Sequence, residues 1–150
     1  MPTFRNASAA DLPEIIRLLH DDEIGSGREA AAAGADPAYA AAFESIERDE
    51  NNHVLVAEQG GRVVGCMQIT YTPSLTRRGT LRATIEGVRV RSDARGGGIG
   101  TRMFRHAFDL ARRRGCGIVQ LTTDVRRPEA LRFYERLGMR PTHVGMKMPL

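Results

Sequence analysis

Residues 95–100 read Arg-Gly-Gly-Gly-Ile-Gly, and they follow a β-prone segment that ends near Arg91. We expect a helix directly after them, from about Thr101 to Arg114. A strand, loop and helix in this order aim free backbone N–H groups and the positive end of the helix dipole at one point. Glycine lets an anion approach the backbone closely and adopts positive φ without strain. The pattern therefore predicts an anion site, to which Arg95 and Arg102 add charge-assisted hydrogen bonds; a flexible surface turn is the alternative.

Two common nucleotide sites do not fit this loop. No Gly-Lys-Ser/Thr sequence accompanies the glycines, which disfavours a nucleoside triphosphate loop. The Gly98-x-Gly100 pair has no third glycine three residues later, and it follows several expected strands instead of lying in a first β-α-β unit. A dinucleotide site is therefore disfavoured as well.

The loop and the segments around it resemble the GNAT superfamily of N-acetyltransferases, whose motif is R/Q-x-x-G-x-G/A between a bulged strand and a helix. In this chain the motif reads Arg95, Gly96, Gly97, Gly98, Ile99, Gly100. The similarity spans residues 83–139, from Ile-Glu-Gly-Val-Arg-Val through the glycine loop to Ala-Leu-Arg-Phe-Tyr-Glu-Arg-Leu-Gly-Met. These segments in one order are a specific signal.

The resemblance implies that acetyl-CoA is the donor and that an amine attacks its thioester directly in a ternary complex. It places the pyrophosphate on the N–H groups of Gly96 to Thr101 and the pantetheine arm against the backbone of Val88, Arg89 and Val90. Two central strands are expected to splay apart, with the thioester in the gap. Gly87, which indicates a β-bulge inside its strand, suits such a gap.

Acyl transfer to an amine requires a deprotonated amine, a polarised carbonyl and a protonated leaving thiolate. Glu86 lies in an otherwise apolar strand, where a carboxylate is out of place unless it faces a wet cleft. It is our candidate for the base, acting directly or through a water. A solvated strand edge, or an ion pair with Arg82 or Arg89, is the alternative. The resemblance assigns the polarisation of the carbonyl to the N–H of Val88.

Tyr134 is the candidate acid. It belongs to a stripe of the expected helix 128–137 at i, i+3, i+4, i+7 spacing, formed by Ala130, Phe133, Tyr134 and Leu137, and this spacing alone favours a core position. The resemblance instead implies that its phenol lies beside the CoA sulfur and protonates it.

One position departs from the family pattern. Related sequences often carry an asparagine three residues before the alanine of the last motif, and here that residue is Arg127. Arg127 is a candidate for contacting the CoA phosphates, or else Arg126 and Arg127 form an exposed loop pair. His20, His53 and His106 are expected at the surface, and His143 is a weak candidate for the acceptor pocket.

The elements that must position these residues follow from periodicity. Ser8-x-x-Asp11 has the form of a capping box and predicts a helix that ends near His20. Residues 21–36 are acidic and then rich in glycine and alanine, which favours a mobile connection or a weakly formed helix. A second helix is expected over residues 37–48. Residues 54–56 and 63–71 predict a hairpin around Gly60 and Gly61.

The second half continues in the same way. A loop is expected over 72–80, strands over 81–91 and 118–123, and a last β-prone segment over 143–148. Gly115 and Gly138 are expected to stop the two helices before them. With the resemblance, these elements predict one α/β domain over residues 1–150. It has three layers, in which about four helices flank a mixed, mostly antiparallel sheet of about six or seven strands with a splayed pair.

Charge is distributed unevenly along the 150 residues. Residues 1–75 carry 5 arginines and 12 acidic residues, whereas residues 76–150 carry 17 basic and 6 acidic residues. The basic half contains the expected anion site, so it is the half suited to a polyanionic partner. Of the 22 basic residues only Lys147 is a lysine; selection for bidentate phosphate contacts and biased codon usage explain this equally well.

Composition excludes several classes of protein. No apolar run approaches the roughly 18 residues of a membrane span, and the N-terminus has no export pattern, so we expect a cytoplasmic protein. Cys66 and Cys116 and the four scattered histidines give no metal-ligand spacing. We expect reduced thiols, no metal, no membrane partner and no nucleic-acid partner, since no aromatic-rich RNA-binding motif accompanies Arg112, Arg113 and Arg114.

The resemblance implies transfer of an acetyl group to a small primary amine, and the order of the segments is similar to that of GNAT members that acetylate aminoalkylphosphonates or amino sugars. Arg77, Arg78 and Arg82 are candidates for binding an acidic group of such an acceptor, whereas Asp21, Asp22 and Glu23 would instead attract a polyamine. A CoA-binding regulator without catalysis and acetylation of a protein amine are the alternatives. A homodimer is possible.

Overall fold

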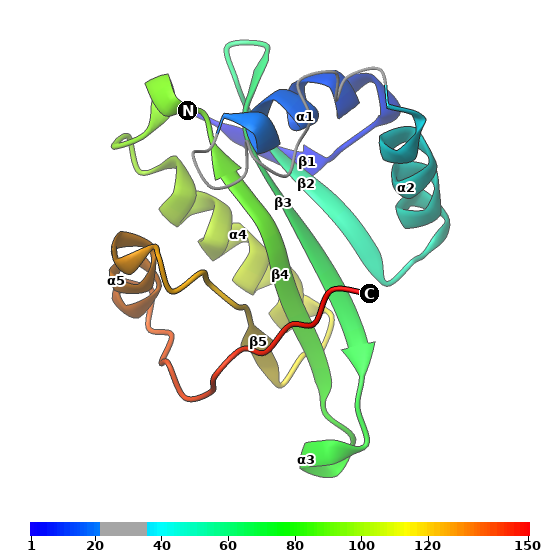
Figure 1. Cartoon of the computed structure of the whole chain (residues 1–150), viewed down its shortest axis with the longest axis vertical. Coiled ribbons are helices and arrows are strands. Elements are labelled where there is room, and N and C mark those ends of the chain that lie inside the picture. Colours follow the sequence, from blue (N-terminus) through cyan, green and yellow to red (C-terminus); the bar gives the residue numbers. More distant parts are fainter. Residues whose placement is uncertain (22–35) are drawn as a thin grey trace. The chain divides into compact units, whose positions relative to one another are not determined.

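The computed structural model describes residues 1–21 and 36–150. Its elements are β1 (Thr3–Asn6), α1 (Leu12–His20), α2 (Pro37–Arg48), β2 (Asn52–Gln59), β3 (Arg62–Pro73), α3 (Thr76–Gly79), β4 (Leu81–Val90), α4 (Ile99–Arg113), β5 (Ile118–Gln120) and α5 (Pro128–Arg136), with short 3₁₀ turns at Ala9–Asp11 and Ser92–Ala94. Five strands form one sheet in the order β1-β2-β3-β4-β5. Neighbours are antiparallel except β4 and β5, which are parallel (Figure 1). The predicted mixed, mostly antiparallel sheet is confirmed with fewer strands than expected.

The chain divides into two compact units, Met1–Gln120 and Leu121–Leu150. The first contains the whole sheet with α1, α2, α3 and α4, and the second contains α5. A single domain over 1–150 stays a prediction. No helix within the described residues is long and apolar enough to cross a membrane.

Capping fixes the start of the first two helices. The Asp11 carboxylate accepts a hydrogen bond of 2.8 Å from the Ser8 backbone N–H, which completes the predicted capping box at the 3₁₀ turn Ala9–Asp11 that leads directly into α1. Asp36 caps α2 by accepting from the backbone N–H of Ala38 at 2.9 Å. Both helices are thereby confirmed, whereas most of the connection expected over 21–36 lies outside the described residues.

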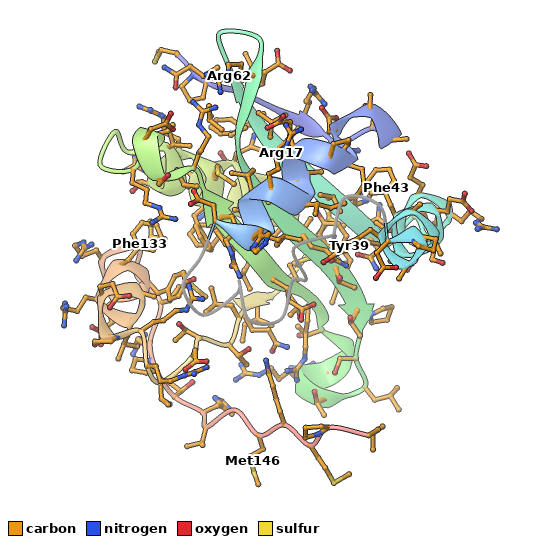
Figure 2. The ribbon with its side chains drawn as sticks, turned by 45° about the horizontal axis from the view of Figure 1, so that its top comes forward. Arg17, Tyr39, Phe43, Arg62, Phe133 and Met146 are labelled. Carbon is orange, nitrogen blue, oxygen red and sulfur yellow. The ribbon has the colours of Figure 1, made fainter. Side chains whose placement is uncertain are left out.

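The sheet separates two packing faces (Figure 1). On one face, α1 places Ile15 and Leu18 against Val56, Val63 and Cys66. Phe43, the buried residue of α2, lies on the side of its helix that faces the strands (Figure 2). The other face packs on α4, whose buried residues are Ile99, Met103, Phe104, Ala107 and Ala111.

Gly65 allows α4 to approach β3 closely. A Cβ atom built at this position would lie 2.7 Å from the Met103 sulfur and 3.0 Å from the Arg89 carbonyl oxygen. Both distances are shorter than ordinary contacts between such atoms, so a larger residue would push the helix and sheet apart. This packing holds the start of α4 beside the end of β4.

The hairpin of β2 and β3 is confirmed, with positive φ at Gly60 and Gly61. The loop predicted over 72–80 is shorter, because β3 continues to Pro73 and α3 forms a single turn in which Arg77 and Arg78 have φ of 53° and 60°.

Two strand predictions need correction. β5 ends at Gln120 instead of residue 123. The strand expected over 143–148 is not formed, and in the described part of the chain these residues have no ladder partner. Val144, Met146 and Met148 alternate with small or polar residues, but the alternation provides no backbone partner, which a strand also requires.

In the second unit, Gly138 ends α5 as predicted. Its φ is 91°, and its N–H donates to the Glu135 carbonyl at 2.9 Å while the Met139 N–H donates to the Tyr134 carbonyl at 3.1 Å. This pair of bonds is a Schellman motif. Gly115 ends α4 in the same way, with bonds from residues 115 and 116 to Arg112 and Ala111.

Candidate functional site

The glycine loop lies between the end of β4 and the first turn of α4. Gly96 and Gly98 have φ of 81° and 73°, and Gly98 is the residue that caps the helix. The first backbone bond of the helix runs from Arg102 N–H to the Gly98 carbonyl at 3.1 Å. The N–H groups of Ile99, Gly100 and Thr101 therefore have no acceptor inside the helix. The loop has the geometry predicted for an anion site.

Arginines frame this loop. Arg102 donates to the Gly97 carbonyl at 2.9 Å, and Arg95 donates to the carbonyls of Val90 at 3.0 Å and Asp21 at 3.1 Å. All three acceptors are backbone carbonyls and therefore neutral, and the Asp21 carboxylate accepts a separate hydrogen bond from the Ser92 N–H at 3.1 Å. An anion on the loop would therefore meet the helix N-terminus and two guanidinium groups.

The predicted bulge in β4 is confirmed. Cys66 pairs with Arg89 and Gln68 with Glu86, so Met67 lies opposite two residues, Gly87 and Val88. Gly87 has φ of 59°, which glycine adopts without strain.

The pairing of β4 with β5 ends just before this bulge. It covers Arg82 to Thr84 on β4 and Ile118 to Gln120 on β5. Beyond Thr84, the edge of β4 on the β5 side has no strand partner among the described residues. The residues expected to hold the pantetheine arm, Val88, Arg89 and Val90, lie in this half of the strand.

Glu86 lies at the start of this free edge and is exposed to solvent. It forms no ion pair with any residue that the structure describes. Arg82 instead donates to Thr76 at 2.5 Å and to Gln120 at 3.2 Å, and Arg89 donates to the Val88 carbonyl at 2.7 Å. The ion pair considered as an alternative role for Glu86 is not formed, and a solvated carboxylate remains.

Strand register reveals polar residues that the sequence analysis did not single out. These residues lie on the same face of the sheet as Glu86. Together with Glu86 they form a set that we call the polar row: Asn52, Gln68, Thr70, Arg82, Thr84, Glu86 and Gln120. The Asn52 side-chain oxygen accepts from Gln68 at 2.9 Å and from Thr70 at 3.1 Å, and Gln120 donates to the Thr84 hydroxyl at 3.2 Å. Alternating polar residues at 68, 70 and 72 and at 82, 84 and 86 were the available signal.

Tyr134 and Arg127 belong to the second unit. Tyr134 is half-buried on α5, where its ring meets that of Phe133 edge to face at 5.4 Å. Arg127 precedes the helix, and its carbonyl accepts from the N–H of Ala130 at 3.1 Å. Asp124 accepts three hydrogen bonds from Arg126, which hold the pKa of this carboxyl well below its usual range. Arg126 is exposed and bonds to Asp124, whereas Arg127 is half-buried. The two arginines therefore do not form the exposed loop pair considered as the alternative.

The three histidines expected at the surface, His20, His53 and His106, are each half-buried, and His106 has an aromatic partner. It stacks on Phe4 with ring centroids 5.2 Å apart, and burial lowers its pKa. His53 is half-buried, and His143 is exposed beside Thr142. No group of three potential metal ligands occurs within residues 1–21 and 36–150.

Comparison with known proteins adds an independent observation. A model of the acetyltransferase (GNAT) family matches residues 13–139. Two curated relatives are the glucosamine 6-phosphate N-acetyltransferase of Trypanosoma brucei brucei, 33% identical over 60% of this chain and 59% of its own length, and the aminoalkylphosphonate N-acetyltransferase of Salmonella typhimurium, 29% identical over 71% and 68%. The chain spans between 43% and 68% of the length of the curated relatives it matches.

A solved structure covers the chain completely. The crystal structure of a transcriptional regulator from Bacillus halodurans C-125 is 46% identical, covers 100% of both chains and superimposes with a TM-score of 0.97. The fold described here is therefore one already seen in crystals.

Proposed function

Because the chain belongs to the acetyltransferase (GNAT) family, we propose that it transfers the acetyl group of acetyl-CoA to the primary amine of a small molecule. One observation carries this proposal. The glycine loop, with positive φ at Gly96 and Gly98, leads into α4 directly after β4, and β4 has a bulge and no strand partner beyond Thr84 on its β5 side among the described residues. The loop suits a pyrophosphate, and the free edge offers backbone groups to an extended amide-containing arm.

Acetyl-CoA supplies the activated acetyl group when it is bound. The N–H groups of Gly96 to Thr101 hold its pyrophosphate, assisted by Arg95, Arg102 and Arg127. The backbone of Val88, Arg89 and Val90 holds the pantetheine amides. The carbonyls of Val88 and Val90 already accept from arginine side chains, but a carbonyl oxygen has two lone pairs and can accept a second bond.

Three groups of the chain then act on the reaction. Glu86 accepts the proton of the attacking amine, a role that its solvated and unpaired carboxylate supports. The Val88 N–H donates to the carbonyl oxygen as negative charge develops on it. The Tyr134 hydroxyl donates its proton to the departing sulfur, a role supported by its position in the family motif.

The acceptor is a small amine that also carries a phosphate or phosphonate. Two relatives are described by such acceptors, glucosamine 6-phosphate and an aminoalkylphosphonate. The polar row offers hydroxyl and amide partners on the face that carries Glu86. Arg82, at the end of that row, together with Arg77 and Arg78, supplies positive charge for the anionic group.

Paired acceptors test this assignment. With acetyl-CoA in excess, kcat/KM is measured for glucosamine 6-phosphate and for glucosamine, which share the amine and differ in the phosphate. We expect a preference of at least tenfold for the phosphorylated acceptor, the scale of one charge-assisted hydrogen bond, and its loss in Arg82→Gln. Equal values for the two acceptors would exclude recognition of the phosphate.

A second function is a CoA-binding regulator without catalysis, because the 46% identical structure is described as a transcriptional regulator. Such a protein would bind CoA but would release no thiol with any amine. A homodimer in the cytoplasm stays a prediction for either function, and light scattering of the purified chain tests its oligomeric state.

A further inference from the structure

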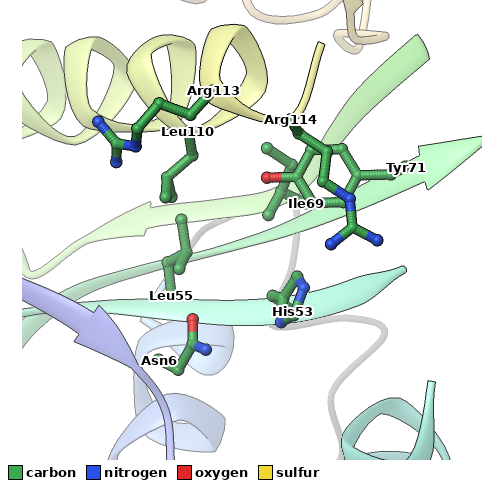
Figure 3. A pocket seen from close by; sticks show the side chains of 8 residues that line it. All are labelled: Asn6, His53, Leu55, Ile69, Tyr71, Leu110, Arg113 and Arg114. Carbon is green, nitrogen blue, oxygen red and sulfur yellow. The ribbon is translucent and has the colours of Figure 1, made fainter. Parts of the chain in front are cut away.

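A second cavity lies at the opposite end of α4 from the glycine loop (Figure 3). It has a volume of about 290 Å³ and is lined by Asn6, His53, Leu55, Ile69, Tyr71, Leu110, Arg113 and Arg114. We call it the α4 C-terminal pocket. Since α4 has 15 residues and rises about 1.5 Å per residue, its two ends lie roughly 22 Å apart. The pocket belongs entirely to the first unit and shares no residue with the candidate acetyl-CoA site.

The floor of the pocket is apolar. Leu55 and Ile69 come from β2 and β3 and are almost completely buried, with 4% and 0% of their surface exposed. Leu110 reaches in from α4 (Figure 3). Leu110 is half-buried and therefore offers the main apolar surface to a ligand, while Leu55 and Ile69 close the base of the pocket behind it.

The rim of the pocket carries two arginines, Arg113 and Arg114. No carboxylate lines the pocket among the described residues. Arg113 is exposed and forms no ion pair or hydrogen bond with any residue that the structure describes. The neighbouring Arg112 differs, because it pairs with Asp109 at 2.8 Å and does not line the pocket.

Arg114 is held in place by neutral partners. Its guanidinium donates to the Asn51 side chain at 2.8 Å and lies 5.1 Å from the centre of the Tyr71 ring. His53 meets the same ring edge to face at 5.9 Å. Burial raises the pKa of Tyr71, so its hydroxyl keeps its proton at neutral pH. That hydroxyl forms no hydrogen bond with any described residue and remains available as a donor.

We propose that the α4 C-terminal pocket binds a small organic carboxylate with an apolar body. The carboxylate accepts hydrogen bonds from Arg113 and from the Tyr71 hydroxyl, in the field of Arg114. The apolar body lies against Leu110, above the base that Leu55 and Ile69 close. The combination of an arginine without an ion pair, a hydroxyl donor without a partner among the described residues and an aliphatic floor selects against neutral and against fully polar ligands.

Benzoate is the probe that matches this description, with benzamide as its neutral counterpart and acetate as the anion without an apolar body. Affinities are measured by calorimetry on the full chain, and the binding site is located by amide chemical shifts in NMR spectra. We expect benzoate to bind at least tenfold more tightly than either analogue and to shift the amides near His53, Tyr71 and Arg113.

Two adjacent arginines provide the matched variants. Arg113→Gln should weaken benzoate binding at least tenfold, whereas Arg112→Gln, which removes the same charge one residue away, should change it less than twofold. Circular dichroism verifies that both variants fold. The proposal is overturned by equal binding of benzoate and benzamide, by equal losses in the two variants, or by shifts that cluster at residues 96–101.

Discussion

Gly98 and Gly61 have the same backbone φ of +73°, one at the start of α4 and the other in the turn between β2 and β3. Neither is held there by a crowded neighbour: a Cβ atom would meet nothing within 4 Å at Gly61 and only the end of Arg102 at 4.0 Å at Gly98. Both glycines are needed for their backbone conformation. Only Gly98 lies in the proposed pyrophosphate site.

This pair separates backbone strain from ligand binding. Gly98→Val and Gly61→Val should both lower the free energy of unfolding by about 1–3 kcal/mol, since valine is strained at positive φ. Only Gly98→Val should weaken CoA binding, by about 1–3 kcal/mol, because its branched side chain blocks close approach of the phosphate. Calorimetric titration with CoA measures this, and unchanged affinity in a folded Gly98→Val protein would remove the loop from the site.

Glu86→Gln removes the proposed base while keeping the size of the side chain. We expect kcat to fall by ~10²-fold or more with little change in CoA affinity, since proton transfer by a positioned side chain contributes on this scale. Glu47→Gln, which makes the same chemical change at an exposed position of α2, is the control. A normal kcat and pH profile in Glu86→Gln would show that the proton goes elsewhere.

Tyr134→Phe distinguishes an acid from a packing residue, because it removes only the hydroxyl. The acid role predicts a kcat lower by ~10²–10⁴ with nearly normal acetyl-CoA binding, since the hydroxyl acts in the transition state. Tyr39→Phe, at another half-buried tyrosine, should have nearly normal kinetics. Steady-state rates beside thermal melts decide the question: a Tyr134→Phe enzyme as fast as the Tyr39→Phe control is incompatible with the acid role.

Stability in acid should depend on Asp11. Its carboxylate accepts two hydrogen bonds from Arg5, at 2.7 and 2.9 Å, which hold its pKa far below its usual range. The unfolded pKa is about 3.9, so the pair stabilises the fold above about pH 4, and this stabilisation disappears as the pH falls through the folded-state pKa.

Asp11→Asn should therefore lower the free energy of unfolding by about 1–3 kcal/mol at pH 7, and the difference from the natural chain should shrink below about pH 3. Glu44→Gln breaks an exposed pair with Arg48 and should cost less than about 0.5 kcal/mol. Urea unfolding at several pH values measures both, and a difference for Asp11→Asn that stays constant down to pH 2 would contradict the assignment.

Local signals were sufficient wherever a short segment determines its own structure. The Ser8-x-x-Asp11 capping box precedes α1, and Gly115 and Gly138 mark the ends of α4 and α5, because caps and positive-φ stops act within one turn. The glycine loop was predictable for the same reason.

Features that depend on pairing were harder to predict. The polar row exists because register aligns Thr70 with Asn52 and with Thr84, and no spacing along one strand specifies that alignment. Residues 143–148 have the alternation of a strand but no partner. His106 carries a polar side chain on a helix and nevertheless stacks on Phe4 of β1, a contact between elements about a hundred residues apart.

Amine-dependent release of thiol from acetyl-CoA tests the central claim most directly. The natural chain and Gly98→Val are incubated with acetyl-CoA and a panel of small amines that includes glucosamine 6-phosphate and an aminoalkylphosphonate, and mass spectrometry identifies the products. We predict that the natural chain forms the N-acetylated amine in step with thiol release and that Gly98→Val loses this activity at limiting acetyl-CoA. Tight CoA binding by the natural chain without amine-dependent thiol release from any member of the panel would contradict the account and favour a CoA-binding regulator.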